Sequence, residues 1–202
     1  MSQAELVMTR LGARPAAPAL RRTPSDDEID AFERAIEAPL PGGYRQFLAG
    51  YGGYCFRTRV VFPIAEACPW GQLGDIDVFL AVTGDPAFDI TEAATRTYVG
   101  RVPDETIPIA RDPGGNLVLL GVEGMVVGQV FFWDHEYRAL AGRMDQLVDD
   151  LRAAGADLRR LDSAGIIHAW ERRFGDRPVG YGNTYRVAAS FDDFLASLRF
   201  AS

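Results

Sequence analysis

The sequence has few cysteines and histidines, no long apolar run and no recognisable secretory signal. Its 202 residues include two cysteines and two histidines, and all 21 basic residues are arginines, which indicates a compositional bias of the source. No run of about 18 apolar residues occurs, so we expect no transmembrane helix. Residues 1–22 have no apolar core long enough for a secretory signal. We therefore expect a cytoplasmic protein that does not enter a membrane.

The few cysteines and histidines also argue against a structural metal. A zinc site of that kind needs four Cys or His ligands at close spacing, whereas Cys55 and Cys68 form no C-x-x-C motif. We expect two buried thiols in a reducing compartment, and a Cys55–Cys68 disulfide stays open from the sequence. We expect neither a metal nor a cofactor.

Two short motifs invite a chemical interpretation. In "WDHE", Asp134, His135 and Glu136 are consecutive, but neighbouring residues of a strand point to opposite faces, so a charged, solvated strand end is favoured over a metal site or a general base. The stretch "RDPGGN" (111–116) lacks the Lys-Ser/Thr of a phosphate-binding loop and no helix follows it. We interpret it as a tight turn.

Acidic charge is the strongest feature of the composition. The net charge is −7 and the pI about 4.9, with 48% apolar residues, enough for a single large core. Such a surface repels nucleic acids and attracts basic proteins. An acidic cluster in the first half of the chain is either a solvated face or a docking patch, and consists of Asp75, Asp77, Asp85, Asp89 and Glu92.

Helix signals are clearest in residues 25–51. Ser25 and Glu28 form a capping box, and a helix is expected to end near Ala38 because Pro39 disfavours helix before it. Pro41 suits the first turn of a second helix, "LPGGYRQFLAGYGG", which the Gly pair ends. Before this pair, residues 2–12 are expected to form a short helix, and 13–22 a Pro/Ala-rich surface linker.

The middle of the chain has strand patterns and the end returns to helix. Strands are expected at 58–64, 77–82, 107–110, 116–122 and 126–134, with a short helix at 91–102. Amphipathic helices are expected at 143–161 and 163–175, which pack on the scaffold, and Ser190 caps a closing helix "SFDDFLASL". Residues 177–189 are expected to form a loop or a weak strand.

The order of these elements resembles the SMI1/KNR4 family of the SUKH superfamily. The resemblance rests on three stretches between Ser25 and Leu198: "SDDEIDAFERAIEAPLPGGYRQFLAGYGG", "IPIARDPGGNLVLL", and "VFFWDHE" with the later "SFDDFLASL". Residues at family pattern positions are Leu40, Pro41, Tyr44, Phe47, Leu48, Gly52, Gly53, Gly115, Asn116, Trp133, Asp134, Phe191, Phe194 and Leu195. Most of them are core or turn residues, which specify a scaffold rather than an active site.

The resemblance implies an α+β fold with a mixed, largely antiparallel sheet packed by N-terminal and C-terminal helices. Residues 1–24 form an N-terminal helix and linker, and 25–202 a domain with a helical insertion at about 138–188, longer than the family pattern. It also implies a non-enzymatic immunity protein that binds a cognate basic toxin, a nuclease or deaminase, as a monomer or in a 1:1 complex.

Two alternative functions remain at this point. One is a regulatory scaffold that binds another cellular protein, and the other is an enzyme with a pocket near Cys55, Asp134 and His135. For the binding protein, the candidate partner-binding residues are Asp75, Asp77, Asp85, Asp89, Glu92, Asp134, Glu136, Asp145, Asp149, Asp150, Glu171 and Arg172.

Overall fold

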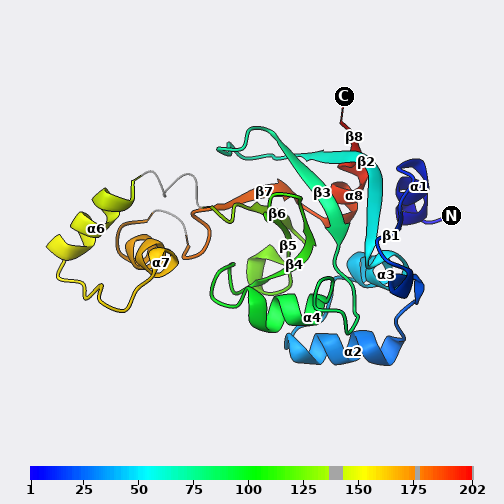
Figure 1. Cartoon of the computed structure of the whole chain (residues 1–202), viewed down its shortest axis with the longest axis horizontal. Helices are drawn as coiled ribbons and strands as arrows, with labels where there is room; N and C mark the ends of the chain where they lie inside the picture. Colours follow the sequence, from blue (N-terminus) through cyan, green and yellow to red (C-terminus); the bar gives the residue numbers. More distant parts are fainter. Residues whose placement is uncertain (137–142, 176–177, 202) are drawn as a thin grey trace.

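The structure of the chain is a computed structural model that describes residues 1–136, 143–175 and 178–201 (Figure 1). One sheet lies at its centre, with strand order β1-β2-β3-β4-β5-β6-β7 and with β8 paired to β2. All pairs of named strands are antiparallel, and one isolated parallel bridge joins Ala81 and Asp89. These observations confirm the expected α+β class and the largely antiparallel sheet. The strands are β1 (Arg14–Pro15), β2 (Tyr54–Pro63), β3 (Leu73–Phe79), β4 (Thr106–Arg111), β5 (Leu117–Gly121), β6 (Val130–Trp133), β7 (Thr184–Ala188) and β8 (Arg199–Phe200).

The connection that follows β2 contacts β7, the last strand of the sheet order. The backbone amides of Ala65 and Glu66 donate to the carbonyl of Arg186 in β7, at 2.9 and 3.3 Å. The amide of Arg186 donates in turn to the Glu66 carboxylate at 2.9 Å. The outer edge of β7 is therefore covered at Arg186, which protects it from pairing with another chain.

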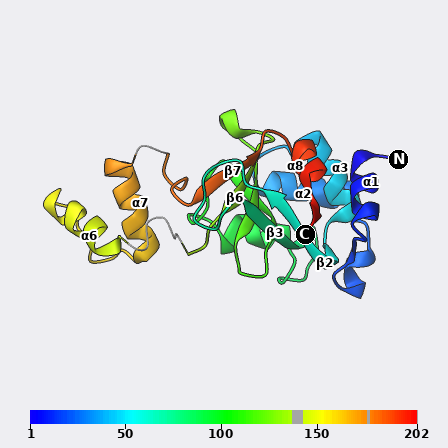
Figure 2. The same ribbon diagram turned by 90° about the horizontal axis from the view of Figure 1, so that it is seen from above.

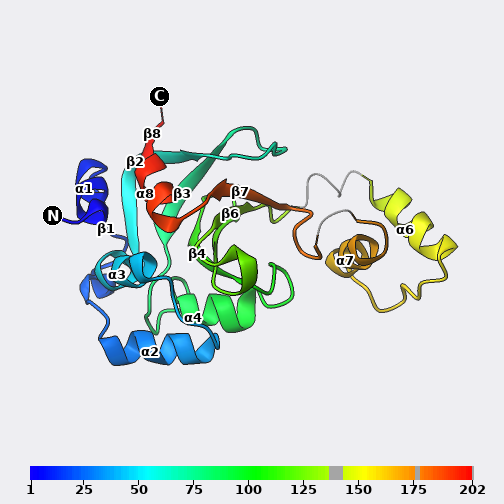
Figure 3. The same cartoon turned by 180° about the vertical axis from the view of Figure 1, so that it is seen from behind.

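Capped helices pack on one face of the sheet (Figure 3). Ser25 and Glu28 form the expected capping box at the start of α2 (Asp26–Ala35), and α3 (Gly42–Tyr51) begins directly after Pro41. Ser190 accepts a hydrogen bond from the Asp193 amide at the start of α8 (Phe191–Ser197). The side chains of this closing helix meet α3, since the rings of Tyr44 and Phe191 are 5.0 Å apart.

The N-terminal segment shares the sheet and core of the rest of the chain. In α1 (Gln3–Arg10) Met8 is buried in the main cluster, and the Arg10 guanidinium donates to the Leu198 carbonyl at 2.8 Å. Where a surface linker was expected at 13–22, the chain forms β1 and the 3-10 turn η1 (Pro18–Arg21). The division of the chain at residue 24 stays a prediction.

Side chains are buried on both faces of the central strands. In β5, Val118 faces the main cluster beneath the helices, whereas Leu119 joins a second cluster on the opposite face. In β6, Phe132 and Trp133 divide in the same way. Strands buried on both faces read as continuous apolar runs, which is why "NLVLL" and "VFFW" show no polar alternation.

Two connections differ from their sequence patterns. The helix expected at 91–102 is shorter: α4 (Ile90–Glu92) continues as the π-helical turn η2 (Ala93–Thr97). The strand expected from residue 126 begins at Val130, because the 3-10 turn η3 (Gly124–Val126) folds over β5. At Gly121 a Cβ atom would collide with the Val126 carbonyl, so only glycine allows this approach.

The inserted helices lie at one end of the molecule, beyond β7 and far from α1 (Figures 1 and 2). The helices α6 (Met144–Ala153) and α7 (Ser163–Phe174) pack on each other, and Leu147 and Ile167 form a buried cluster of their own. The expectation that their apolar faces pack on the scaffold core is therefore wrong, because the two helices bury these faces against each other. The expected insertion also includes residues 138–142 and 176–177, which lie outside the described residues, and its end, β7, belongs to the sheet.

Candidate partner-binding surface

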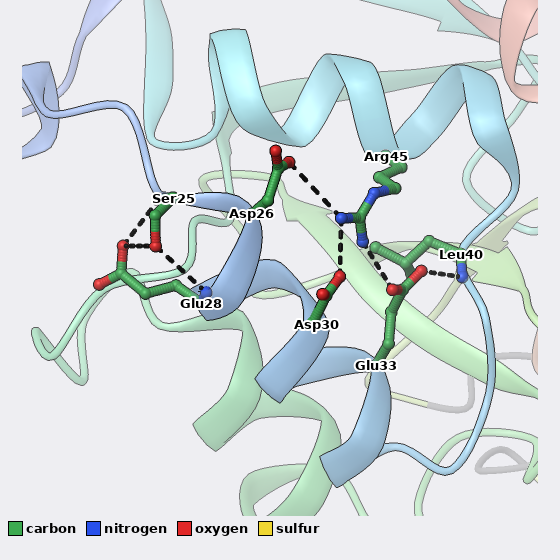
Figure 4. A network of polar contacts seen from close by, with 7 residues as sticks. All are labelled: Ser25, Asp26, Glu28, Asp30, Glu33, Leu40 and Arg45. Carbon is green, nitrogen blue, oxygen red and sulfur yellow. Dashed lines mark hydrogen bonds and ion pairs between the residues drawn. The ribbon is translucent and has the colours of Figure 1, made fainter.

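Arg45 holds α2 and α3 together through three carboxylates of α2 (Figure 4). Its guanidinium lies 2.7 Å from Asp30, 2.6 Å from Glu33 and 3.6 Å from Asp26. The hydrogen bond with Asp30 is the main cause that raises the pKa of Arg45. The other oxygen of Glu33 accepts the Leu40 amide at 2.7 Å. This network fixes the Leu-Pro junction, and its carboxylates already have a cation within the chain.

The acidic residues predicted on and after β3 mostly have partners as well. Asp75 forms a bidentate pair with Arg59, at 2.8 and 2.9 Å, while Asp77 is exposed on the same strand. The carboxylate of Asp89 accepts the amides of Thr83 and Glu92, which caps α4. These contacts make Asp75 and Asp89 structural residues.

The two remaining residues of this segment are more accessible. The exposed Asp85 accepts the amide of Ala87 at 3.0 Å. Glu92 pairs with Arg96 at 3.2 Å, one helical turn away, with both side chains open to solvent. Such exposed pairs contribute little stability, so a partner displaces them at low cost.

The predicted residues in the second half of the chain are both buried and exposed. The Asp134 side chain is 0% exposed and accepts the Glu136 amide. Glu171 in α7 is 5% exposed and accepts the amides of Gly180 and Gly182, both at 3.0 Å. Carboxylates buried in this way do not reach a partner, so Asp134 and Glu171 are not part of the accessible surface.

The inserted helices retain accessible charge. Asp145, Asp149 and Arg172 are exposed, and Asp150 accepts the indole N–H of Trp170 at 2.9 Å. Glu136 is exposed at the end of β6. The twelve predicted residues thus belong to four segments, namely β3, the region 85–92, the end of β6 and the inserted helices, rather than to one continuous stretch.

The fold keeps Cys55 apart from Asp134 and His135, the other two residues of the enzyme alternative. The paired residues Cys55, Val78, Arg111, Leu117 and Trp133 form one row across the sheet. Four strand spacings therefore separate Cys55 from the end of β6, about 19 Å along the sheet. Both cysteines are free and half-buried, not disulfide-bonded. Burial is the main cause that raises the pKa of Cys68.

His135 is held by the turn at residues 111–116, whose sequence is similar to a phosphate-binding loop. The Asp112 carboxylate accepts the amides of Gly114 and Asn116, as expected for a tight turn. The Asn116 side-chain oxygen accepts the His135 amide at 3.2 Å and lies 2.9 Å from its Nδ1. These bonds give His135 a structural role at the end of β6. Within the described ranges, no three His, Cys, Asp or Glu residues gather closely enough to hold a metal ion.

Two cavities flank α2 beside the α4–η2 segment. The first, of about 280 Å³, lies at the N-terminal end of α2 and is lined by Glu28 and Asp89 among others. Glu28 is paired with Arg22 at 2.6 and 2.8 Å. The second, of about 310 Å³, lies at the C-terminal end of α2 and is lined by Glu37, Asp104 and Glu123 among others.

The sequence patterns missed these three carboxylates. Glu37 follows α2 with a φ of 57°, a conformation uncommon outside glycine. Asp104 and Glu123 lie in connections between strands and have no motif around them. Only the fold brings the three residues to one cavity, so no local signal identified them.

Comparisons with known proteins find a family model, a relative of similar sequence and a solved structure of similar fold. The model of the SMI1 / KNR4 family (SUKH-1) matches residues 23–150. An SPbeta prophage-derived uncharacterized protein, YokK, of Bacillus subtilis (strain 168) is 29% identical over 125 residues, which are 55% of this chain and 62% of that protein's length. A crystal structure of a protein from Pseudomonas syringae pv. tomato superposes with a TM-score of 0.46 and 18% identity, over 65% of this chain and 83% of that one.

The family match includes the helix pair α2–α3, strands β2 to β6 and most of α6. The closing helix α8 lies outside the matched range. Among the described residues, no helix combines the length and apolar character needed to cross a bilayer. Because the family model spans more than half of the sequence, the chain belongs to the SMI1/KNR4 family (SUKH-1).

Proposed function

We propose that this chain is an immunity-type binding protein that neutralises a cognate bacterial toxin, a nuclease or a deaminase, by covering it in a 1:1 complex. The observation that carries the proposal is the family match over residues 23–150. The similarity to a prophage-derived protein supports it, because prophage regions are a setting in which toxin defence is useful. Family analogy on its own does not define a site.

The charge of the molecule supports a basic partner. With a net charge of −7, the protein attracts cationic proteins, and this attraction raises the rate at which they associate with it. The exposed carboxylates of Asp77, Asp85, Glu136, Asp145 and Asp149 are available for such contacts. Binding by surface charge requires no assembled catalytic group, which agrees with the separation of Cys55 from His135.

If a toxin-like gene lies next to this one, its co-expression with this chain in a bacterial host tests the proposal. The wild-type chain is expected to restore growth, and the purified proteins to form a 1:1 complex whose association rate falls with added salt. His135→Ala is the matched variant for the enzyme alternative, and it is expected to fold and protect like wild type. Binding without protection would favour a regulatory scaffold instead, and loss of protection in a folded His135→Ala protein would favour an enzyme.

A further inference from the structure

The cavity at the C-terminal end of α2 is open to solvent, and its lining combines apolar side chains with hydroxyls and carboxylates. Its walls come from four parts of the chain, namely the end of α2, η2, the start of β4 and the residues after β5. Ile36, Ile107 and Val122 supply apolar surface, and Val99 at the mouth is 62% exposed. A volume of about 310 Å³ is at the small end of ligand pockets. It suits one inserted side chain rather than a large molecule.

The rim of this cavity carries negative charge that the chain does not neutralise. Glu37, Asp104 and Glu123 are exposed, and the described part of the chain gives their carboxylates no hydrogen bond or ion pair. No basic residue lines the cavity. The first cavity differs, because Glu28 there is already paired with Arg22.

A metal ion does not explain the three carboxylates. They form no cluster that could hold one within the described residues, so we consider an occupant that offers several donors at once. A guanidinium does so, since it presents five donors in a planar fork, and its aliphatic stem packs on apolar side chains. Arginine is also enriched among the residues that anchor protein interfaces in pockets.

We propose that the cavity bounded by Glu37, Asp104 and Glu123 receives an arginine side chain of the basic partner. This inference rests on the proposed function, and it adds the anchor point and its chemistry. The arginine stem lies against Ile36, Val99 and Val122, and its guanidinium donates hydrogen bonds to the rim carboxylates. Lysine is a poorer fit, because a compact and strongly hydrated ammonium bridges fewer carboxylates.

The first test uses a probe peptide, Ac-Ala-Leu-Arg-Leu-Ala-NH₂, titrated into the ¹⁵N-labelled full chain. We expect saturable amide shifts in residues 35–37, 94–99, 104–107 and 122–123. The same peptide with citrulline keeps the shape of arginine but loses its charge, and it is expected to bind about tenfold more weakly. Equal binding of the citrulline peptide, a lysine peptide that binds as tightly, or shifts confined to other residues would overturn the proposal.

Two matched variants locate the charge that matters. Glu37→Gln/Asp104→Asn/Glu123→Gln removes the rim and is expected to weaken the peptide about tenfold. Glu5→Gln/Asp27→Asn/Asp192→Asn removes the same number of negative charges from exposed residues that do not line the cavity, and it is expected to bind like wild type. Equal loss in both variants would show a general charge effect and overturn the site.

A single substitution guards against misfolding of the triple variant. Glu123→Arg changes one exposed turn residue and places a cation at the rim, so it is expected to abolish peptide binding with the thermal midpoint unchanged. In the toxin assay, a rim variant that protects as well as wild type would refute the anchor while the proposed function stands. A wild-type chain that fails to protect would refute the function, and the peptide titration would still decide the cavity.

Discussion

Replacing Glu33 tests whether the Leu-Pro junction depends on one carboxylate. In Glu33→Ala the buried Leu40 loses the acceptor of its amide, which lay at 2.7 Å. An unsatisfied buried donor costs about 1–3 kcal/mol. Arg45 loses its contact at 2.6 Å but keeps Asp30, and a partly exposed ion pair contributes about 0–1 kcal/mol. The free energy of unfolding should therefore fall by about 1–4 kcal/mol.

Urea denaturation followed by circular dichroism measures this change as a lower midpoint with an unchanged slope. Glu33→Gln keeps an oxygen for the Leu40 amide and loses only the charge, so it should cost less than about 1 kcal/mol. Arg34→Ala, at the exposed neighbouring position, should be within about 0.5 kcal/mol of wild type. If Glu33→Gln were as damaging as Glu33→Ala, the charge and not the amide bond would be decisive, and the reasoning would be refuted.

Two further predictions concern the same helix pair. Phe47 is buried, and its ring centroid lies 4.7 Å from that of Phe79 and 5.0 Å from that of Phe191. Phe47→Ala should therefore lower the free energy of unfolding by about 3–5 kcal/mol. A melting curve of this variant that matches wild type would contradict the core position of Phe47. Hydrogen bonds from Arg22 and then Ser25 lower the pKa of Glu28 from 4.5 to about 2. Because the folded pKa is the lower one, Glu28 adds stability above pH 4.5 that is lost as the pH falls toward 2. Melts of Glu28→Gln should show a flatter loss in that window, and curves parallel to wild type would count against it.

The elements that could be predicted from sequence are those fixed by local bonds. The capping box of Ser25 and Glu28 and the cap at Ser190 act within three residues, and Pro41 restricts the backbone where α3 begins. The turn at Asp112 belongs to the same group. In each case the signal and its structural effect lie in one short stretch of chain. The end of α2 was placed too late: the helix ends at Ala35 rather than near Ala38, and the chain turns at Glu37 before it reaches Pro39.

The elements that were missed depend on distant residues. The strands β1 and β8 contain two residues each and exist because they pair with opposite ends of β2. Two residues carry no periodicity, so a Pro/Ala-rich segment resembled a linker. The inserted helices were expected to pack on the scaffold because each has an apolar face. Periodicity shows that a face is buried but not against what, and here α6 and α7 bury their faces against each other.

The same distinction governs which charges a partner can use. The predicted residues come from an acidic cluster, a charged strand end and the polar faces of two helices, but such patterns do not show whether a charge is already paired. Asp75 is paired with Arg59, and Glu171 is buried on two backbone amides. A partner would have to break those contacts before it gained its own. A carboxylate without a partner in the fold has no such cost, and a hydrogen bond between charged groups then contributes about 1.5–3 kcal/mol. Uncompensated charge beside an apolar surface is therefore a better guide to a binding site than charge density along the chain, and in the described residues Glu37, Asp104 and Glu123 meet that criterion together.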